Sequence, residues 1–172
     1  MKKQICILTI AIIFLYGCSG NLNQGLNSEI VDTTTIKNAD EQSKLKNNNL
    51  KLLAGAKSLY YRFDKAHFES SLKEGKIIFL DFHADWCPIC LQEKPGILAA
   101  FNELDDENVV GYQVHYNDGQ TTEDDKEMAK KYGITYQHTK VIIGKDGNVA
   151  LKSLEVFSKE KVINEINKAL SE

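Results

Sequence analysis

Two cysteines separated by two residues, Cys87 and Cys90, are the residues in this sequence best suited to chemistry. Pro88 predicts that a helix begins at this point, because proline is favoured where its missing N–H would have no partner. Cys87 then lies at the helix N-terminus, where free N–H groups and the helix dipole favour a thiolate. Cys90 follows one turn later on the same face, within disulfide reach. This spacing predicts thiol–disulfide exchange, although zinc sites also use CxxC pairs.

A buried strand is expected to lead into this helix. Residues 77–80 form an apolar run, Ile-Ile-Phe-Leu, that is too short for a helix and begins with β-branched side chains. Such a run is typical of a strand buried on both faces. Asp81 follows the run directly. A carboxyl group in apolar surroundings has a raised pKa, which brings it closer to the working pH of a general base.

This strand–helix unit resembles the active site of the thioredoxin superfamily. Residues 86–90, Trp-Cys-Pro-Ile-Cys, match its WCxxC motif, Asp81 matches its buried acid, and Pro95 matches the proline that kinks its active-site helix. The motif is most similar to the C-terminal domains of membrane thiol:disulfide interchange proteins and related periplasmic thioredoxin-like proteins. The resemblance implies an α/β fold, a single thioredoxin-fold domain with a central mixed sheet flanked by helices.

The resemblance also implies roles for the site residues. Cys87 is expected to be the exposed nucleophile, and Cys90 to be the more buried resolving thiol that closes the disulfide after a mixed disulfide has formed. Asp81 is expected to help deprotonate Cys90 through water. Trp86, Pro88 and Ile89 are expected to contact the substrate. No cofactor is expected beyond the redox-active disulfide itself.

The resemblance extends over residues 131–150, with one departure in a loop that the family uses to bind substrate. Thioredoxins commonly have a cis-proline there, whereas this chain has His138, followed by Thr139. A cis peptide before a residue other than proline costs about 3–4 kcal/mol, so we expect a trans bond and a different loop path. His138 and Thr139 are still expected to line the substrate site. The lysine that the family often places near the buried acid is absent from residues 109–116.

The remaining patterns predict the element order βαβαβαββα. Alternating or continuous apolar residues indicate strands, and apolar residues at helical spacing between capping residues and glycines indicate helices. The expected strands are 59–63, 77–82, 109–116, 139–143 and 149–154, and the expected helices are 64–75, 88–104, 123–132 and 158–170.

The N-terminal residues are typical of a targeting segment. Two lysines precede an apolar run at 5–15, and Leu-Tyr-Gly-Cys at 15–18 resembles a bacterial lipobox. We therefore expect a lipoprotein-type signal peptide at 1–17 and lipid on Cys18; an ordinary secretory signal and an uncleaved anchor remain alternatives. Residues 18–57 contain no aromatic side chain and are expected to be a flexible, disordered tether, in which a helical turn near 50–56 is conceivable. The thioredoxin-like domain is expected at 58–172.

The number of cysteines and the net charge restrict the classes of function that the chain can have. Cys6 leaves with the signal and Cys18 carries lipid, so an exported chain keeps two free thiols, which indicates redox activity. The net charge of −3, without a basic patch, excludes nucleic acid as a partner. We expect a lipid-anchored monomer in the cell envelope that faces the periplasm or the exterior. Its expected partners are protein thiols or disulfides and an upstream electron donor or acceptor.

Two functions from different classes fit these residues. The first is a membrane-tethered thiol:disulfide oxidoreductase acting on exported protein or small-molecule disulfides. The alternative is a Cu(I)- or Zn-binding or metal-delivery protein that uses Cys87, Cys90 and His138, because two thiolates and an imidazole suit either ion. The sequence does not indicate whether an oxidoreductase would reduce, oxidise or isomerise.

Overall fold

The computed structural model describes residues 50–171 of the 172-residue chain. The expected signal peptide, Cys18 and most of the expected tether lie outside the described residues. The elements are β1 (Leu52–Ala54), β2 (Leu59–Arg62), α1 (Lys65–Lys73), β3 (Ile77–His83), α2 (Pro88–Glu103), β4 (Val109–His115), α3 (Glu123–Lys131), β5 (Thr139–Ile143), β6 (Val149–Ser153) and α4 (Lys159–Ser171).

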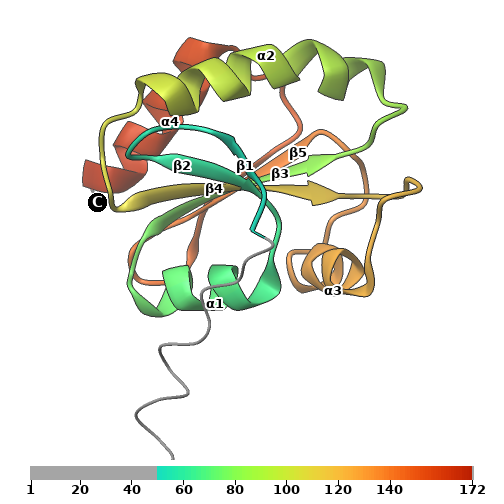
Figure 1. The fold of residues 1–172 in the computed structure, drawn as a ribbon, viewed down its shortest axis with the longest axis horizontal. Coiled ribbons are helices and arrows are strands. Elements are labelled where there is room, and N and C mark those ends of the chain that lie inside the picture. Colours follow the sequence, from blue (N-terminus) through green and yellow to red (C-terminus); the bar gives the residue numbers. More distant parts are fainter. Residues whose placement is uncertain (1–49, 172) are drawn as a thin grey trace, which may run out of the picture. The chain divides into compact units, whose positions relative to one another are not determined.

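A six-stranded sheet in the order β1-β2-β4-β3-β5-β6 organises the domain. Strands β2, β4 and β3 are parallel to one another, whereas β1 pairs antiparallel with β2, β5 with β3, and β6 with β5. Helices α2 and α4 cover one face of this sheet, and α1 and α3 cover the other (Figure 1). This arrangement confirms the predicted α/β domain with a mixed sheet and flanking helices.

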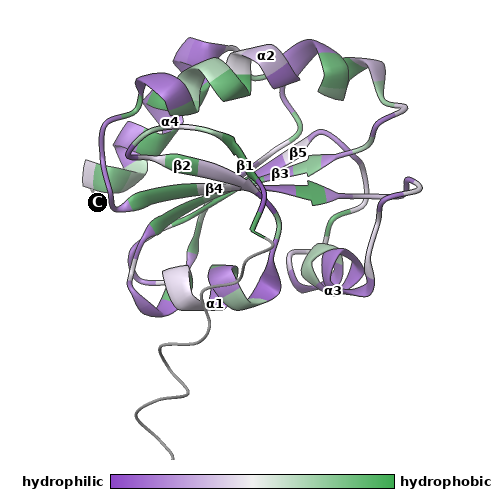
Figure 2. Cartoon of the chain, viewed as in Figure 1, coloured by the Kyte–Doolittle hydropathy of each residue, from purple (hydrophilic) through white to green (hydrophobic). Residues whose placement is uncertain are grey.

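The side chains of the central strands alternate between two apolar layers. Ile77 and Phe79 of β3 join the layer under α2 and α4, whereas Ile78, Leu80 and Phe82 join the layer against α1 and α3. Each large side chain buried in this way stabilises the fold by about 1.5–3 kcal/mol. In Figure 2 the apolar colours gather in the strands, and the outward turns of the helices are hydrophilic. β3 is therefore held rigidly from both sides, and it leads directly into the site.

Gly111 of β4 allows the close packing in the layer under α2. A Cβ atom at this position would lie 2.4 Å from the Phe101 ring and 2.6 Å from the Tyr60 ring. These two rings stack on each other with centroids 4.9 Å apart. The absence of a side chain at Gly111 thus lets the aromatic pair lie directly on the sheet.

The boundary between tether and domain differs from the sequence expectation. Leu52–Ala54 forms an edge strand antiparallel to β2, and Ala54 joins the core, so the domain includes residues that were assigned to the tether. The helical turn considered for 50–56 is wrong. Three residues are too few for local preference to separate strand from helix, and pairing with β2 decides the outcome.

Candidate active site

The turn from β3 into α2 places the two cysteines as the sequence predicted. All of β3 is buried, and α2 begins at Pro88 with Cys87 as its N-cap residue. The Cys87 Sγ accepts a hydrogen bond from the backbone N–H of Cys90 at 3.2 Å. An N-cap side chain normally satisfies one of the free N–H groups of the first turn, and here the sulfur atom does so.

The two thiols are free, and they differ in hydrogen bonding rather than in exposure. Each cysteine is only 2% exposed, so the expected contrast between an exposed Cys87 and a buried Cys90 is wrong. The Cys90 thiol donates to the Cys87 Sγ at 2.7 Å. Burial and this donated hydrogen bond raise the pKa of Cys90 to about 12. Cys87 is the acceptor of both contacts, and Cys90 keeps its proton.

Asp81 lies on the sheet beneath α2 and is almost completely buried. Its Oδ2 accepts a hydrogen bond from the Tyr60 hydroxyl at 3.2 Å. Burial raises the pKa of Asp81, while the nearby Lys140 and His83 side chains act in the opposite direction. The Asp81 charge in turn contributes to the raised pKa of Cys90, which places the two groups within electrostatic range. Within residues 50–171 no direct hydrogen bond joins Asp81 to Cys90.

A buried ion pair that the sequence analysis missed joins the sheet to the active-site helix. Lys140 of β5 is the register partner of Asp81, and its ammonium group pairs with the carboxylate of Glu93 from α2. Glu93 also accepts the backbone N–H of Phe157 at 2.6 Å. A lysine near the buried acid is therefore present, but on β5 rather than on β4. Lys and Glu are usually exposed, so neither position stood out in the sequence.

The His138 loop is fixed by its backbone. The His138 N–H donates to the carbonyl of Phe82 at 2.6 Å, and its own carbonyl accepts from Lys140 Nζ at 2.9 Å. His138 has φ of 56°, a left-handed conformation that costs a residue with a side chain about 1–2 kcal/mol. These two hydrogen bonds hold it there. Thr139 donates from Oγ1 to the Tyr136 carbonyl at 2.7 Å, which tightens the same turn. The trans peptide at His138 stays a prediction.

The structure does not assemble the metal site of the alternative hypothesis. Cys87, Cys90 and His138 do not bring their donor atoms within 4.8 Å of one another anywhere in the described chain. The Nδ1 atom of His138 is buried without a hydrogen-bond partner, and the sulfur atoms are occupied with each other. The three ligands that the sequence placed together are therefore not arranged around one ion.

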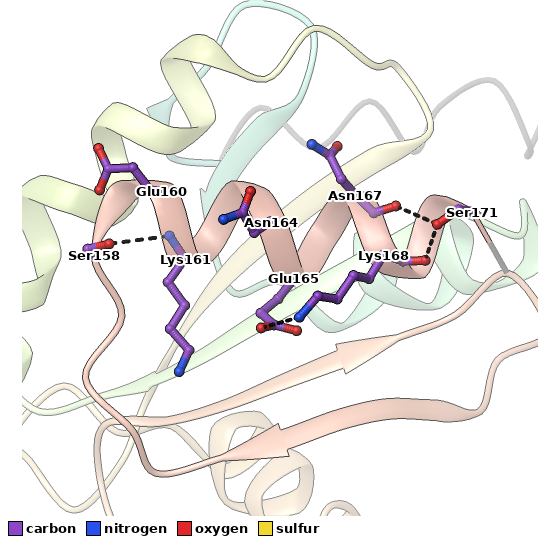
Figure 3. Close-up of a pocket in the computed structure, with 8 residues that line it drawn as sticks. All are labelled: Ser158, Glu160, Lys161, Asn164, Glu165, Asn167, Lys168 and Ser171. Carbon is purple, nitrogen blue, oxygen red and sulfur yellow. Dashed lines mark hydrogen bonds and ion pairs between the residues drawn. The ribbon is translucent and has the colours of Figure 1, made fainter.

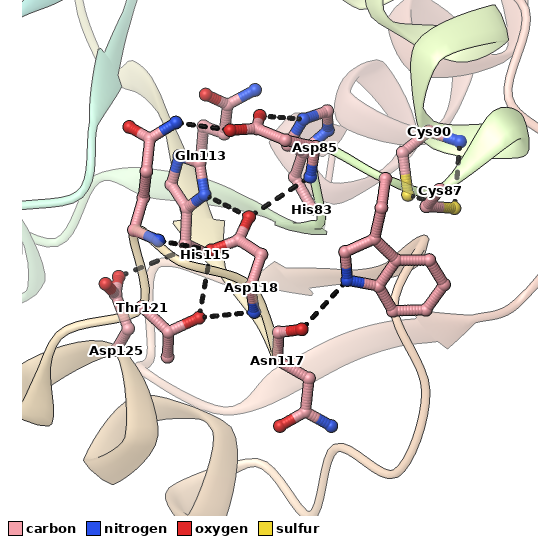
Figure 4. A network of polar contacts seen from close by, with 12 residues as sticks. His83, Asp85, Cys87, Cys90, Gln113, His115, Asn117, Asp118, Thr121 and Asp125 are labelled. Carbon is pink, nitrogen blue, oxygen red and sulfur yellow. Dashed lines mark hydrogen bonds and ion pairs between the residues drawn. The ribbon is translucent and has the colours of Figure 1, made fainter.

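Exposed side chains surround the buried thiols. Trp86 is 57% exposed, Pro88 and Ile89 are also exposed, and the Trp86 indole N–H donates to the Asn117 carbonyl at 2.9 Å (Figure 4). Tyr136, in the loop that precedes His138, is 61% exposed.

A surface depression along α4 lies apart from the dithiol and offers no comparable chemistry. It has a volume of about 660 Å³ and is formed along the outer side of α4 (Figure 3). Its lining residues are all polar or charged, and none is a cysteine or histidine: Ser158, Glu160, Lys161, Asn164, Glu165, Asn167, Lys168 and Ser171. This depression is the solvated face of a helix, so the dithiol at the start of α2 is the candidate site.

Comparisons with known proteins agree with the fold. A mixed sheet flanked by helices, with a CxxC pair at the start of a helix that follows a central strand, defines a thioredoxin-like domain. The family model "Thioredoxin" matches residues 60–168, and the chain therefore belongs to the thioredoxin family. No curated protein matches the chain. None of the helices within residues 50–171 has the length and apolar character needed to cross a membrane.

Solved structures show the same fold at low sequence identity. A DsbH oxidoreductase superimposes with a TM-score of 0.53 at 19% identity, covering 77% of this chain and 99% of its own. Trxlp from Edwardsiella tarda gives 0.52 at 19% identity, covering 61% of this chain and 95% of its own. Thioredoxin from Aeropyrum pernix gives 0.52 at 19% identity, covering 69% and 92%. At these identities the similarity establishes the fold.

Proposed function

We propose that this protein is a thiol:disulfide oxidoreductase that exchanges electrons between its Cys87–Cys90 pair and the disulfides or thiols of exported proteins or small molecules. The observation that carries this proposal is the direction of the hydrogen bonds at the dithiol. Cys87 Sγ accepts from both the thiol and the N–H of Cys90, so negative charge is favoured on Cys87. A protonated resolving thiol is held beside it.

The proposed reaction has two displacement steps. The Cys87 thiolate attacks a substrate disulfide, forms a mixed disulfide and releases the first substrate sulfur as a thiolate. Cys90 then gives its proton through water to Asp81 and attacks the Cys87 sulfur. The Cys87–Cys90 disulfide forms, the second substrate sulfur leaves, and two electrons have passed to the substrate. The reverse sequence oxidises a substrate dithiol, so the direction depends on the electron donor or acceptor with which the protein exchanges.

Asp81 is suited to the second step in particular. Its raised pKa allows it to accept and return a proton closer to neutral pH than an exposed aspartate would. The buried Lys140–Glu93 pair holds β5 against α2 and also anchors the His138 carbonyl. The loop that precedes β5 is therefore fixed relative to the dithiol. Trp86, Ile89 and Tyr136 provide an exposed apolar rim for a substrate chain.

Trapping experiments test this assignment. The Cys90→Ser variant is expected to accumulate mixed disulfides with partners, because the Cys87 intermediate cannot be resolved. The Cys87→Ser variant is expected to lose turnover without trapping partners. Non-reducing gels of both variants, in a Cys6→Ser/Cys18→Ser background that removes the other thiols, measure the outcome. Equal trapping by both variants would overturn the assignment of nucleophile and resolving thiol.

The same proposal places the protein in the cell envelope, attached through lipid on Cys18. What supports it is the apolar run at 5–15 followed by Leu-Tyr-Gly-Cys. Substitution of Cys18 by serine is expected to move the protein from the membrane fraction to the soluble fraction of the envelope. Retention in the membrane fraction would indicate an uncleaved anchor instead.

A further inference from the structure

A second group of chemically capable side chains lies beside the dithiol, at the edge of the sheet where β3 and β4 end. These strands are parallel, so their carboxyl ends meet, and His83 is the register partner of His115. Asp85 follows β3 and Asp118 follows β4. Asp85, His115 and Asp118 each offer one donor atom, and these three atoms lie within 4.8 Å of one another. Figure 4 shows the His115 ring directed at the Asp118 carboxylate and the Asp85 carboxylate directed at His83.

We propose that Asp85, His115 and Asp118 form a binding site for a divalent transition-metal cation of the zinc class. An imidazole nitrogen and two carboxylate oxygens are ligands that Zn²⁺ accepts at about 2.0–2.2 Å, with a fourth position left for water. The imidazole favours such an ion over Ca²⁺ or Mg²⁺, which prefer oxygen ligands alone. The site uses neither active-site thiol and does not depend on the proposed oxidoreductase function.

The arrangement around the three ligands supports a cation. His83 is completely buried, its Nε2 lies 3.2 Å from Asp85 Oδ1, and its Nδ1 has no hydrogen-bond partner. Its ring lies edge-on to that of His115, with centroids 5.7 Å apart. A buried histidine aimed at a liganding carboxylate is a typical supporting contact of a metal site. Among residues 50–171, neither aspartate forms an ion pair with a lysine or arginine.

The present hydrogen bonds show how the ion would fit. His115 Nδ1 and Asp118 Oδ2 share a hydrogen bond of 2.6 Å, and the Asp118 oxygen also accepts the Asp85 N–H at 3.1 Å. Ligands of one tetrahedral zinc ion lie about 3.4 Å apart at the usual bond lengths. The cation would therefore take the place of the shared proton, with a small opening of this contact.

Cation binding would also brace the loop that carries the nucleophile. Asp85 lies two residues before Cys87, and Trp86 donates its indole N–H to Asn117, the neighbour of Asp118. The Gln120 side-chain amide also donates to the Asp85 carboxylate, and an ion shared by Asp85 and Asp118 would add a further link between the β3–α2 loop and the turn after β4. Trp86 is the one tryptophan of the chain, so its fluorescence reports on this link directly.

The test is a titration of the full chain with all four cysteines replaced by serine, which removes every thiol ligand. Isothermal calorimetry with ZnCl₂ after chelator treatment is expected to show one saturable site, with a saturable change in Trp86 fluorescence. Asp85→Asn, at an exposed position, is expected to weaken binding by at least about 10-fold, and His115→Gln likewise. Asp105→Asn is the matched control, because Asp105 is an exposed aspartate that pairs with Lys57 and precedes the opposite end of β4.

The outcomes separate the possibilities. Loss of binding in Asp85→Asn with retention in Asp105→Asn supports the site, provided that both variants melt at the parent temperature. If His115→Gln does not fold, Asp85→Asn alone decides. Absence of saturable zinc binding in the cysteine-free chain would overturn the proposal, and so would unchanged affinity in Asp85→Asn. Tighter binding of CaCl₂ than of ZnCl₂ would overturn the assignment to the zinc class.

Discussion

Replacement of Asp81 by asparagine is expected to slow resolution of the mixed disulfide while leaving the first attack nearly intact. Asparagine keeps the shape of the side chain and an acceptor for the Tyr60 hydroxyl, but it cannot take a proton. The reason lies in the contrast between the two thiols. Cys87 accepts hydrogen bonds, whereas Cys90 donates its proton to Cys87 Sγ and must lose that proton before it can attack.

The size of the effect follows from the usual contribution of a general base. With a pKa raised to about 12, the Cys90 thiol is protonated at pH 7 and has to lose its proton during the attack. A general base that removes the proton during attack commonly contributes 10²–10⁴-fold. Loss of the Asp81 charge also lowers the pKa of Cys90, which offsets part of the loss. We therefore expect resolution to slow by about 10–100-fold at pH 7.

Stopped-flow absorbance with dithiobis(nitrobenzoate) separates the two steps. Attack by Cys87 releases one coloured thiolate, and attack by Cys90 on the mixed disulfide releases the second. With Cys6 and Cys18 replaced by serine, only the second phase should slow in Asp81→Asn. That phase should then rise steadily with pH, because it depends on ionisation of Cys90 alone. Tyr60→Phe keeps the carboxylate and serves as the control, with an expected change below about 3-fold.

Asp81→Asn is also expected to make the folded protein more stable at pH 7. The folded-state pKa of Asp81 is raised above its unfolded value, so the folded protein binds the proton more tightly. Stability is therefore lost as the pH rises from the unfolded pKa near 3.8 through the folded value. Asp81→Asn should remove this loss and raise the urea midpoint at pH 7.

A slowing confined to the first kinetic phase, or an unchanged second phase, would refute the role given to Asp81.

Three further substitutions test the structure around the site. Lys140→Met leaves the Glu93 carboxylate buried without its partner and should lower the free energy of unfolding by about 3–5 kcal/mol in urea titrations; the double variant with Glu93→Gln should recover most of this loss. Gly111→Ala places a Cβ atom 2.4 Å from an aromatic ring and should lower the free energy of unfolding by about 1–3 kcal/mol. Gly119→Ala is the control: no described atom lies within 4 Å of its Cβ position, so this variant should melt at the wild-type temperature. His138→Pro should lower the melting temperature, because proline can neither adopt a φ of 56° nor donate the loop hydrogen bond. His138→Gly should fold as stably as the wild type. Equal melting temperatures of the two variants would contradict the described loop.

Local sequence patterns were sufficient for the strand–helix unit that carries the dithiol. The apolar run at 77–80 and Pro88 predicted a buried strand and a helix start, and both are found. They could be predicted because a strand buried on both faces and a helix that starts at proline each have a sequence signal within a few consecutive residues. The other helices and strands were predicted from local apolar patterns for the same reason. The edge strand Leu52–Ala54 was not predicted, because pairing with β2 decides its conformation.

Other features depend on contacts between residues distant in the chain, and only the tertiary structure decided them. The Lys140–Glu93 pair joins β5 to α2, and nothing local marks either residue as buried. Cys87 was predicted to be exposed and is buried, whereas Cys90 is buried as expected; the burial of a side chain depends on its packing in the folded domain. The meeting of Asp85, His115 and Asp118 requires two parallel strands to end at one edge. The sequence of one short segment determines which of its residues can do chemistry. The sheet determines which segments meet, because the energy of strand pairing depends on residues distant in the chain, which a local pattern does not identify.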